Sequence, residues 1–131
     1  MTMPVVVDAS ALVELLLQSE RAPAVLQAVG RTEMVAPDGI NPEVLSALRR
    51  LERIGELSAG RARQAIDDLL DAAVRRLPTL PLLPDAWMLR ANVTSYDACY
   101  VALARNLRCP LITGDLQLSR APGLGVPLIT V

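Results

Sequence analysis

The chain has 131 residues, a formal net charge of −1 and 52% hydrophobic residues, which is enough to bury the core of one ordinary domain. Its 13 basic residues are all arginines, and it contains no histidine, which excludes a histidine-based ribonuclease mechanism and a Cys/His zinc site. The near-neutral charge also excludes a strongly basic surface over the whole molecule, so any binding of phosphate would depend on local arginine clusters.

The first half of the chain predicts two strand–helix–helix units. A strand over residues 4–7 contains the run Val5-Val6-Val7, which is typical of a parallel sheet covered on both faces. Asp8 would then cap a helix from residue 9 to about 18. We also expect a helix over 24–29, a strand over 33–36, a helix that starts at Asn41-Pro42-Glu43 and ends near 54, and a helix from Ser58 to about 76.

The second half continues the same alternation. Residues 77–84 are rich in Leu and Pro and predict a short strand, which suits the edge of a sheet better than its centre. We expect a helix over 85–93, a helix over 96–107 capped by Thr94 or Ser95, strands over 109–113 and 126–131, and one helical turn after Asp115. This order predicts a parallel α/β sheet in a single domain over residues 1–131.

Cysteine usage and hydropathy indicate the compartment. Cys99 falls in an apolar helical segment and Cys109 lies beside a predicted strand, so we expect reduced thiols and no disulfide. Asp8 interrupts the apolar run near the N-terminus, and no uncharged stretch reaches the roughly 18 residues of a membrane span. We therefore expect a cytoplasmic protein that does not enter a membrane. Aromatic residues make up only 2% of the chain, which argues against a stacking platform for single-stranded bases.

Four carboxylates stand where a strand or a loop passes into a helix: Asp8, Glu43, Asp97 and Asp115. Each has an ordinary interpretation when it is considered alone. Asp8 and Asp115 would cap the helices that follow them, Asp97 would complete a capping box, and Glu43 would interact favourably with a helix dipole.

Considered together, the four acids predict a more specific site. Ligands bind beyond the carboxyl ends of the strands in open α/β sheets, and Asp8, Glu43, Asp97 and Asp115 all map to that edge. The chain offers no lysine or histidine to offset their mutual repulsion. A divalent cation would do so, and oxygen ligands without nitrogen or sulfur favour Mg²⁺ or Mn²⁺. The pattern therefore predicts catalytic and metal-holding roles for these four residues.

Two hydroxyl residues accompany the acids. Ser10 follows Asp8, and Thr113 precedes Asp115. Their side chains would either orient a carboxylate or a bound water, or form ordinary backbone caps.

Three arginines follow Glu43 on the same predicted helix, away from its buried stripe. Arg49, Arg50 and Arg53 would either hold a phosphodiester backbone beside the acids or form a solubilising surface. The sequence leaves both interpretations open.

Four segments that contain the acids resemble the motifs of PIN domains, in the family's order and spacing. They are Val5-Val6-Val7-Asp8-Ala9-Ser10, Pro42-Glu43-Val44-Leu45-Ser46-Ala47-Leu48, Ser95-Tyr96-Asp97-Ala98-Cys99-Tyr100 and Leu111-Ile112-Thr113-Gly114-Asp115. Over nearly its whole length the chain resembles the single-domain VapC-type toxins of bacterial toxin–antitoxin pairs. Some members carry a further acid shortly after the fourth motif, which residues 116–119 do not supply.

This resemblance implies a PIN-like three-layer α/β/α fold with a central, mostly parallel sheet of about five strands, forming a single nuclease domain over residues 1–131. It implies an endoribonuclease that hydrolyses RNA phosphodiester bonds with Mg²⁺ or Mn²⁺ held by the four acids. It also implies a homodimer and a cognate VapB-type antitoxin protein that inhibits the enzyme. The alternative is a non-catalytic α/β interaction domain whose acids only cap helices.

Overall fold

The computed structural model describes residues 2–131. Its five strands are β1 (Pro4–Val7), β2 (Glu33–Pro37), β3 (Val74–Leu77), β4 (Leu111–Thr113) and β5 (Leu128–Thr130). The helices are α1 (Ala9–Leu17), α2 (Ala22–Val29), α3 (Ile40–Arg53), α4 (Ala59–Asp71), the 3₁₀ helix η1 (Leu80–Leu82), α5 (Leu83–Met88), α6 (Ser95–Leu107) and α7 (Leu116–Arg120). Within the described residues, no helix combines the length and apolar character needed to cross a membrane.

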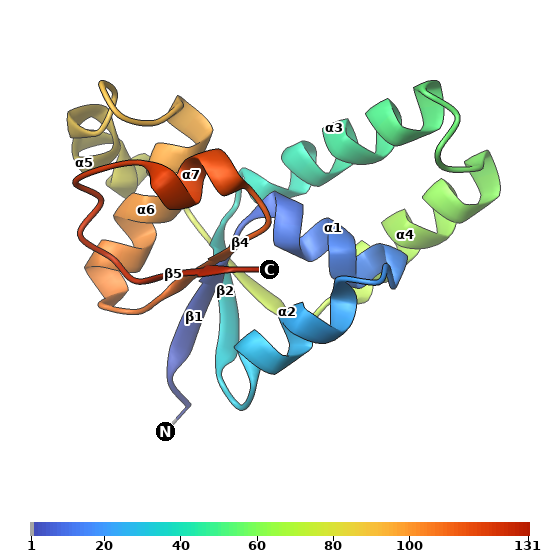
Figure 1. Cartoon of the computed structure of the whole chain (residues 1–131), viewed down its shortest axis with the longest axis horizontal. Coiled ribbons are helices and arrows are strands. Elements are labelled where there is room, and N and C mark those ends of the chain that lie inside the picture. The colour runs from blue at the N-terminus through green and yellow to red at the C-terminus, as the bar shows by residue number, and fades with distance from the viewer. Residues whose placement is uncertain (1) are drawn as a thin grey trace.

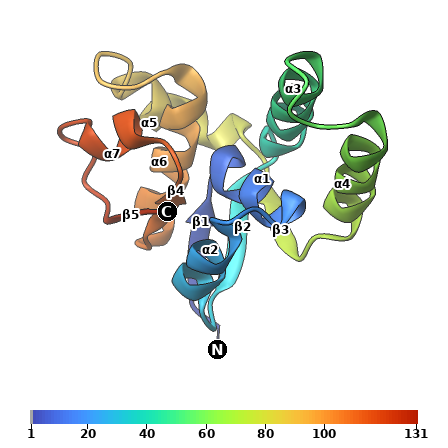
Figure 2. The same cartoon turned by 45° about the vertical axis from the view of Figure 1, so that its right-hand side comes forward.

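The strands form one sheet in the order β3-β2-β1-β4-β5, and every neighbouring pair is parallel. Helices cover both faces (Figure 1): α1 to α4 pack together on one side, and α5 and α6 pack together on the other. The turned view in Figure 2 shows α3 and α4 side by side as a hairpin beside α1. The expected three-layer α/β/α fold with a central parallel sheet is confirmed.

Strand β1 lies in the middle of the sheet and in the centre of the core. Val5, Val6 and Val7 are each at most 1% exposed, because helices cover both faces of a parallel sheet. On α3 the fully buried residues include Val44 and Leu48, which leaves Glu43 at the margin of the buried stripe. The core therefore fixes where the acidic residues emerge.

The segment between α4 and α5 differs from the sequence prediction. We expected a helix to about residue 76 and a strand over 77–84, but α4 ends earlier and β3 precedes the proline-rich segment. The guanidinium of Arg76 donates to the carbonyls of Leu69 and Val74 at 2.9 and 3.0 Å. It thus satisfies backbone acceptors near the end of α4 while its own backbone pairs with β2. The residues after β3 then form η1 and α5, which pack against α6.

The beginning of α3 also differs in detail. We expected this helix to start at Asn41, but α3 begins at Ile40 after Gly39 and has no side-chain cap. The side-chain oxygen Oδ1 of Asn41 instead accepts a hydrogen bond of 3.2 Å from Arg76 Nε. Asn41 therefore links the start of α3 to the edge strand β3.

Candidate functional site

Asp8 follows β1 directly and is only 4% exposed. Its Oδ1 accepts hydrogen bonds from Ser10 Oγ at 2.6 Å and from the Ala11 N–H at 2.9 Å, so it caps α1 as expected. Its Oδ2 accepts a hydrogen bond from Thr113 Oγ1 at the end of β4. Both hydroxyl residues predicted beside the acids therefore contact Asp8 itself.

The fourth acidic segment joins the same network across neighbouring strands. The N–H of Asp115 donates to Thr113 Oγ1 at 3.0 Å, and the N–H of Gly114 donates to Ser10 Oγ at 2.8 Å. A Cβ at position 114 would lie 3.3 Å from that same Oγ, so glycine allows this close approach. Asp115 Oδ1 also accepts the N–H of Gln117 at 2.8 Å and caps α7.

Glu43 lies in the first turn of α3, and its carboxylate does not cap that helix. Its Oε1 accepts a hydrogen bond of 2.9 Å from the hydroxyl of Tyr100, which lies on α6 and is 1% exposed. Tyr100 is not among the site residues predicted from the sequence. Two signals pointed to it: a buried tyrosine needs a hydrogen-bond partner, and Tyr100 lies three residues after Asp97, one turn along the same face of a helix.

Asp97 lies in the first turn of α6, where Thr94 is the cap. Thr94 Oγ1 accepts a hydrogen bond of 3.3 Å from the Asp97 N–H, which confirms Thr94 as the cap residue. The Asp97 side chain lines a cleft together with Asp115. The third and fourth acidic segments therefore border the same space.

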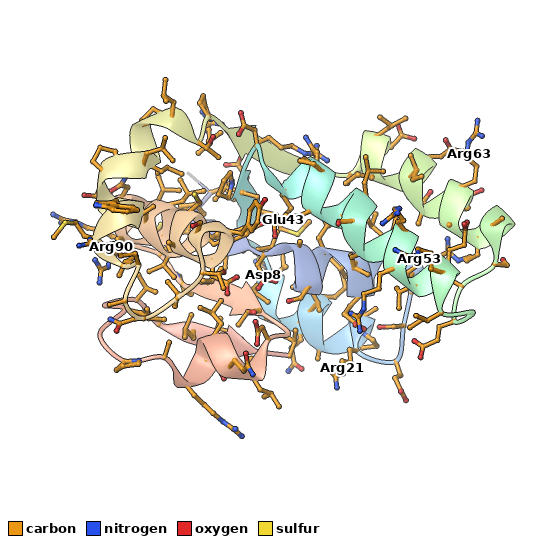
Figure 3. The ribbon with its side chains drawn as sticks, turned by 90° about the horizontal axis from the view of Figure 1, so that it is seen from above. Asp8, Arg21, Glu43, Arg53, Arg63 and Arg90 are labelled. Atoms are coloured by element: carbon orange, nitrogen blue, oxygen red, sulfur yellow. The ribbon has the colours of Figure 1, made fainter. Side chains whose placement is uncertain are left out.

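The carboxylates influence one another electrostatically. Burial is the main cause that raises the pKa of Asp8, Glu43 and Asp97, and hydrogen bonds from neighbouring hydroxyls oppose each shift. The charge of Asp115 adds to the pKa of Asp8 and Asp97, and the charge of Asp8 adds to the pKa of Glu43 and Asp97. All four acids predicted from the sequence thus lie in one electrostatic neighbourhood, with Asp8 and Glu43 near the centre of Figure 3.

The donor chemistry of this site fits a hard divalent cation. Within residues 2–131, no three Asp, Glu or Cys side chains are already close enough to hold one ion together. The carboxylates therefore converge without forming a closed coordination sphere. The donor atoms of the four acids are all oxygens, and burial disfavours the charged forms of Asp8, Glu43 and Asp97. Such a site gains most from a cation such as Mg²⁺ or Mn²⁺ that accepts oxygen ligands and keeps bound waters.

Two clefts border the acids. One has a volume of about 390 Å³ and contains Asp97, Asp115 and the loop between α5 and α6. The other has a volume of about 440 Å³ and is lined by Pro42, Glu43, Ser46 and Tyr96. Each cleft thus includes part of the acidic group.

The three arginines predicted to contact RNA are exposed on α3. Arg50 and Arg53 border a separate cleft of about 300 Å³. Arg53 lies at the outer end of the helix in Figure 3, about 15 Å beyond Glu43 along the helix axis. The contact of Arg49, Arg50 and Arg53 with RNA stays a prediction.

A parallel α/β sheet with carboxylates at the carboxyl ends of its strands is a known arrangement for ligand sites, and comparisons with known proteins specify the family. The chain belongs to the PIN domain family, which it matches over residues 5–124. It is 44% identical to ribonuclease VapC1 of Mycobacterium tuberculosis over 91% of each chain. It is 38% identical to ribonuclease VapC9 of the same species, over 97% of this chain and 98% of that one.

A solved structure shows the same fold at low sequence identity. The crystal structure of VapBC2 from Rickettsia felis, bound to a DNA fragment from their promoter, superposes with a TM-score of 0.68. The match covers 96% of this chain and 97% of that chain at 11% identity. The fold of this chain is therefore shared with the VapBC2 structure over almost its whole length.

Proposed function

We propose that the protein is a VapC-type ribonuclease toxin that hydrolyses RNA phosphodiester bonds with a divalent cation, Mg²⁺ or Mn²⁺. The observation that supports this most is the position of the Glu43 and Asp97 carboxylates. Helix capping accounts for Asp8 and Asp115, as the interaction-domain alternative requires. It does not account for Glu43, which bonds to a residue 57 positions away, or for the burial of several charges that repel one another.

In this proposal Asp8, Glu43, Asp97 and Asp115 hold the cation. A divalent cation supplies charge neutralisation at the phosphate and makes a water molecule more acidic. The neighbouring hydroxyls do the positioning: those of Ser10 and Thr113 fix the two oxygens of Asp8. Asp97 faces the cleft and would accept a proton from the attacking water.

We also propose that a VapB-type antitoxin inhibits the enzyme, which the VapC relatives and the VapBC2 structure support. A mostly apolar cleft of about 460 Å³ between α3 and α4 includes Leu45, Ile66 and Leu70, and suits the apolar face of a partner helix. Pro42 lines both this cleft and the cleft that contains Glu43. A partner bound between α3 and α4 would therefore abut the acidic site.

The assembly and location expected from the family belong to the same proposal. Three apolar side chains of α5, those of Leu83, Trp87 and Met88, are 47%, 65% and 73% exposed, which supports burial against a second copy in a homodimer. Cys99 and Cys109 are both free thiols, as expected for action in the reducing cytoplasm. We propose that residues 1–131 act as a single nuclease domain.

The decisive experiment incubates the purified protein with a mixed RNA pool in Mg²⁺, Mn²⁺ or EDTA and maps the cut ends. We expect defined cuts with either metal and none with EDTA. The Asp8→Asn variant should make no cuts, whereas Asp67→Asn, on the exposed surface of α4, should cut like the unmodified protein. Intact RNA under every condition would favour the interaction domain.

A further inference from the structure

The lining of the cleft that contains Asp97 and Asp115 includes a set of residues that the proposed chemistry does not use. This set consists of residues 90–94, in the loop between α5 and α6, and Gln117 at the start of α7. We propose that it binds the nucleotide next to the scissile phosphate, with Arg90 on a phosphate and the amides of Asn92 and Gln117 on the edge of the base. This inference rests on the proposed ribonuclease activity and names a subsite of it.

Arg90 is held in position but keeps free donors. Its guanidinium lies 4.6 Å from the centre of the Trp87 ring, and its Nη1 donates to the Trp87 carbonyl at 3.0 Å. Within residues 2–131, its Nε and Nη2 have no hydrogen-bond partner, and the residue is exposed. Stacking on an aromatic ring limits the motion of an arginine without using its hydrogen-bond fork. The remaining donors therefore suit a phosphate of the RNA backbone.

The two amides approach the cleft from different parts of the chain. Asn92 and Gln117 are exposed, and neither side chain makes a hydrogen bond to another residue in the described chain. The Gln117 N–H bonds to Asp115 Oδ1 at 2.8 Å, which fixes this residue next to one of the acids. A side-chain amide offers a donor beside an acceptor, and this pair matches the hydrogen-bonding edge of an unpaired base.

The size and charge of the cleft fit one nucleotide. Its volume of about 390 Å³ falls in the range of roughly 300–1,000 Å³ that is common for small-ligand sites. Arg90 is the single basic residue in its lining, which also contains the two acids. The cleft beside Glu43 has no basic residue in its lining. Recognition of a phosphate together with a base is therefore assigned to the Arg90 cleft.

The test compares the cut sites of variants in one RNA pool that contains every short sequence. Asn92→Ala and Gln117→Ala should weaken the base preference at one position beside the cut by about fivefold or more, because a good amide–base pair discriminates at least that much. Arg90→Ala should slow cleavage of all sequences alike and reduce the salt dependence of binding by about one phosphate contact.

Matched controls come from exposed residues far from the cleft. Gln27→Ala on α2 and Arg63→Ala on α4 remove the same chemical groups, and Arg63 lies at the opposite end of the molecule from Arg90 in Figure 3. Both controls should keep the cut pattern and the salt dependence. Binding of short labelled RNAs that differ in the base beside the cut gives a second measurement that does not need cleavage. It is made in an Asp8→Asn background, where Asn92→Ala should reduce the differences in affinity between these RNAs.

The outcomes separate this inference from the proposed function. Cleavage with an unchanged base preference in both amide variants, or cleavage by the unmodified protein without any preference beside the cut, would overturn the subsite alone. A loss of preference in Gln27→Ala as large as in Asn92→Ala would also overturn it. An unmodified protein that cuts no RNA with any divalent metal would overturn the activity itself.

Discussion

The hydroxyl of Tyr100 on α6 donates a hydrogen bond of 2.9 Å to Glu43 on α3, and so joins helices that pack on opposite faces of the sheet. Burial, followed by the charge of Glu43, raises the pKa of Tyr100 above its ordinary value. The phenol therefore stays protonated and remains a donor throughout the physiological pH range. This bond orients a carboxylate that the sequence predicts to hold the metal.

Removing that hydroxyl tests the positioning role of Tyr100. Tyr100→Phe keeps the buried ring, so we expect a folded protein that is less stable by about 1–2 kcal/mol. Cleavage should fall by about 10- to 100-fold, as it does when other residues that orient metal ligands are changed. Cleavage rates over a range of Mg²⁺ concentrations check this, because a misoriented Glu43 should raise the Mg²⁺ concentration that gives half-maximal activity.

Tyr96→Phe provides the matched control. Tyr96 is 67% exposed, and its hydroxyl has no hydrogen-bond partner among residues 2–131. This variant should keep its melting temperature and its response to Mg²⁺. An equal change in the Mg²⁺ response of both tyrosine variants would contradict a specific role for the bond to Glu43.

Asp8→Asn should abolish cleavage and stabilise the metal-free protein at neutral pH. Burial raises the pKa of Asp8 above the ordinary 3.8, so the folded state binds more protons than the unfolded state between the two pKa values. The free energy of unfolding therefore falls as the pH rises through that window. Above the raised pKa, the charged form of Asp8 destabilises the folded protein by its full amount. In EDTA, the variant should melt at a higher temperature than the unmodified protein at pH 7.

The pH dependence gives this prediction a second measurement. The difference in melting temperature between Asp8→Asn and the unmodified protein should shrink as the pH is lowered towards 4, because Asp8 becomes protonated and neutral. Mg²⁺ should raise the melting temperature of the unmodified protein more than that of the variant, since a ligand stabilises the state that binds it. A difference that does not change with pH would show that the Asp8 charge carries no such penalty.

Gly114→Ala tests the close approach of the backbone just after β4 to the side chain of Ser10. The added Cβ would lie 3.3 Å from Ser10 Oγ and would displace a hydroxyl that bonds to Asp8. We expect a modest loss of stability and a measurable loss of cleavage. Gly60→Ala is the control, because a Cβ there meets nothing within 4 Å and alanine favours the helix by about 1 kcal/mol. A Gly114→Ala protein that cuts RNA at the normal rate would show that the position of Ser10 is unimportant.

Local patterns were sufficient to predict the acidic edge of the sheet. The valine run ending at Asp8 gave the observed bounds of β1, because a strand buried on both faces must be continuously apolar. Thr113 was predicted near Asp115 by sequence distance, and it bonds to Asp8 because β1 and β4 are neighbours. The bounds of β1 thus followed from a local pattern, whereas the contact between Thr113 and Asp8 depends on the order of the strands in the sheet.

Two features could not be derived in this way because distant residues decide them. The partner of Tyr100 lies 57 positions away, and spacing along the chain does not reveal which carboxylate a buried phenol will meet. The end of α4 was predicted too late because Arg76 satisfies carbonyls of that helix from the neighbouring strand. Helix propensity alone favours continuing the helix at that point, and the tertiary contact overrides it.

The arginines of α3 give a prediction for RNA affinity. If Arg49, Arg50 and Arg53 contact phosphates, replacing all three by Gln should weaken RNA binding. It should also lower the slope of log affinity against log salt by about 2, since each single-strand phosphate contact contributes about 0.7. Binding titrations over a salt series measure this. An unchanged slope would leave these residues with a solubilising role.

The cleft between α3 and α4 gives a prediction that separates inhibition from catalysis. Leu70 is 77% exposed in that cleft, so Leu70→Glu should leave folding and RNA cleavage unchanged. A bound antitoxin would bury this side chain, and a charge there would weaken the complex by about tenfold or more. Leu26→Glu on α2, where the leucine is 61% exposed, is the matched control and should keep full affinity for the antitoxin.

Coexpression with the antitoxin should then rescue growth in the Leu26 variant and fail to rescue it in the Leu70 variant. Rescue of both would locate the antitoxin on another surface.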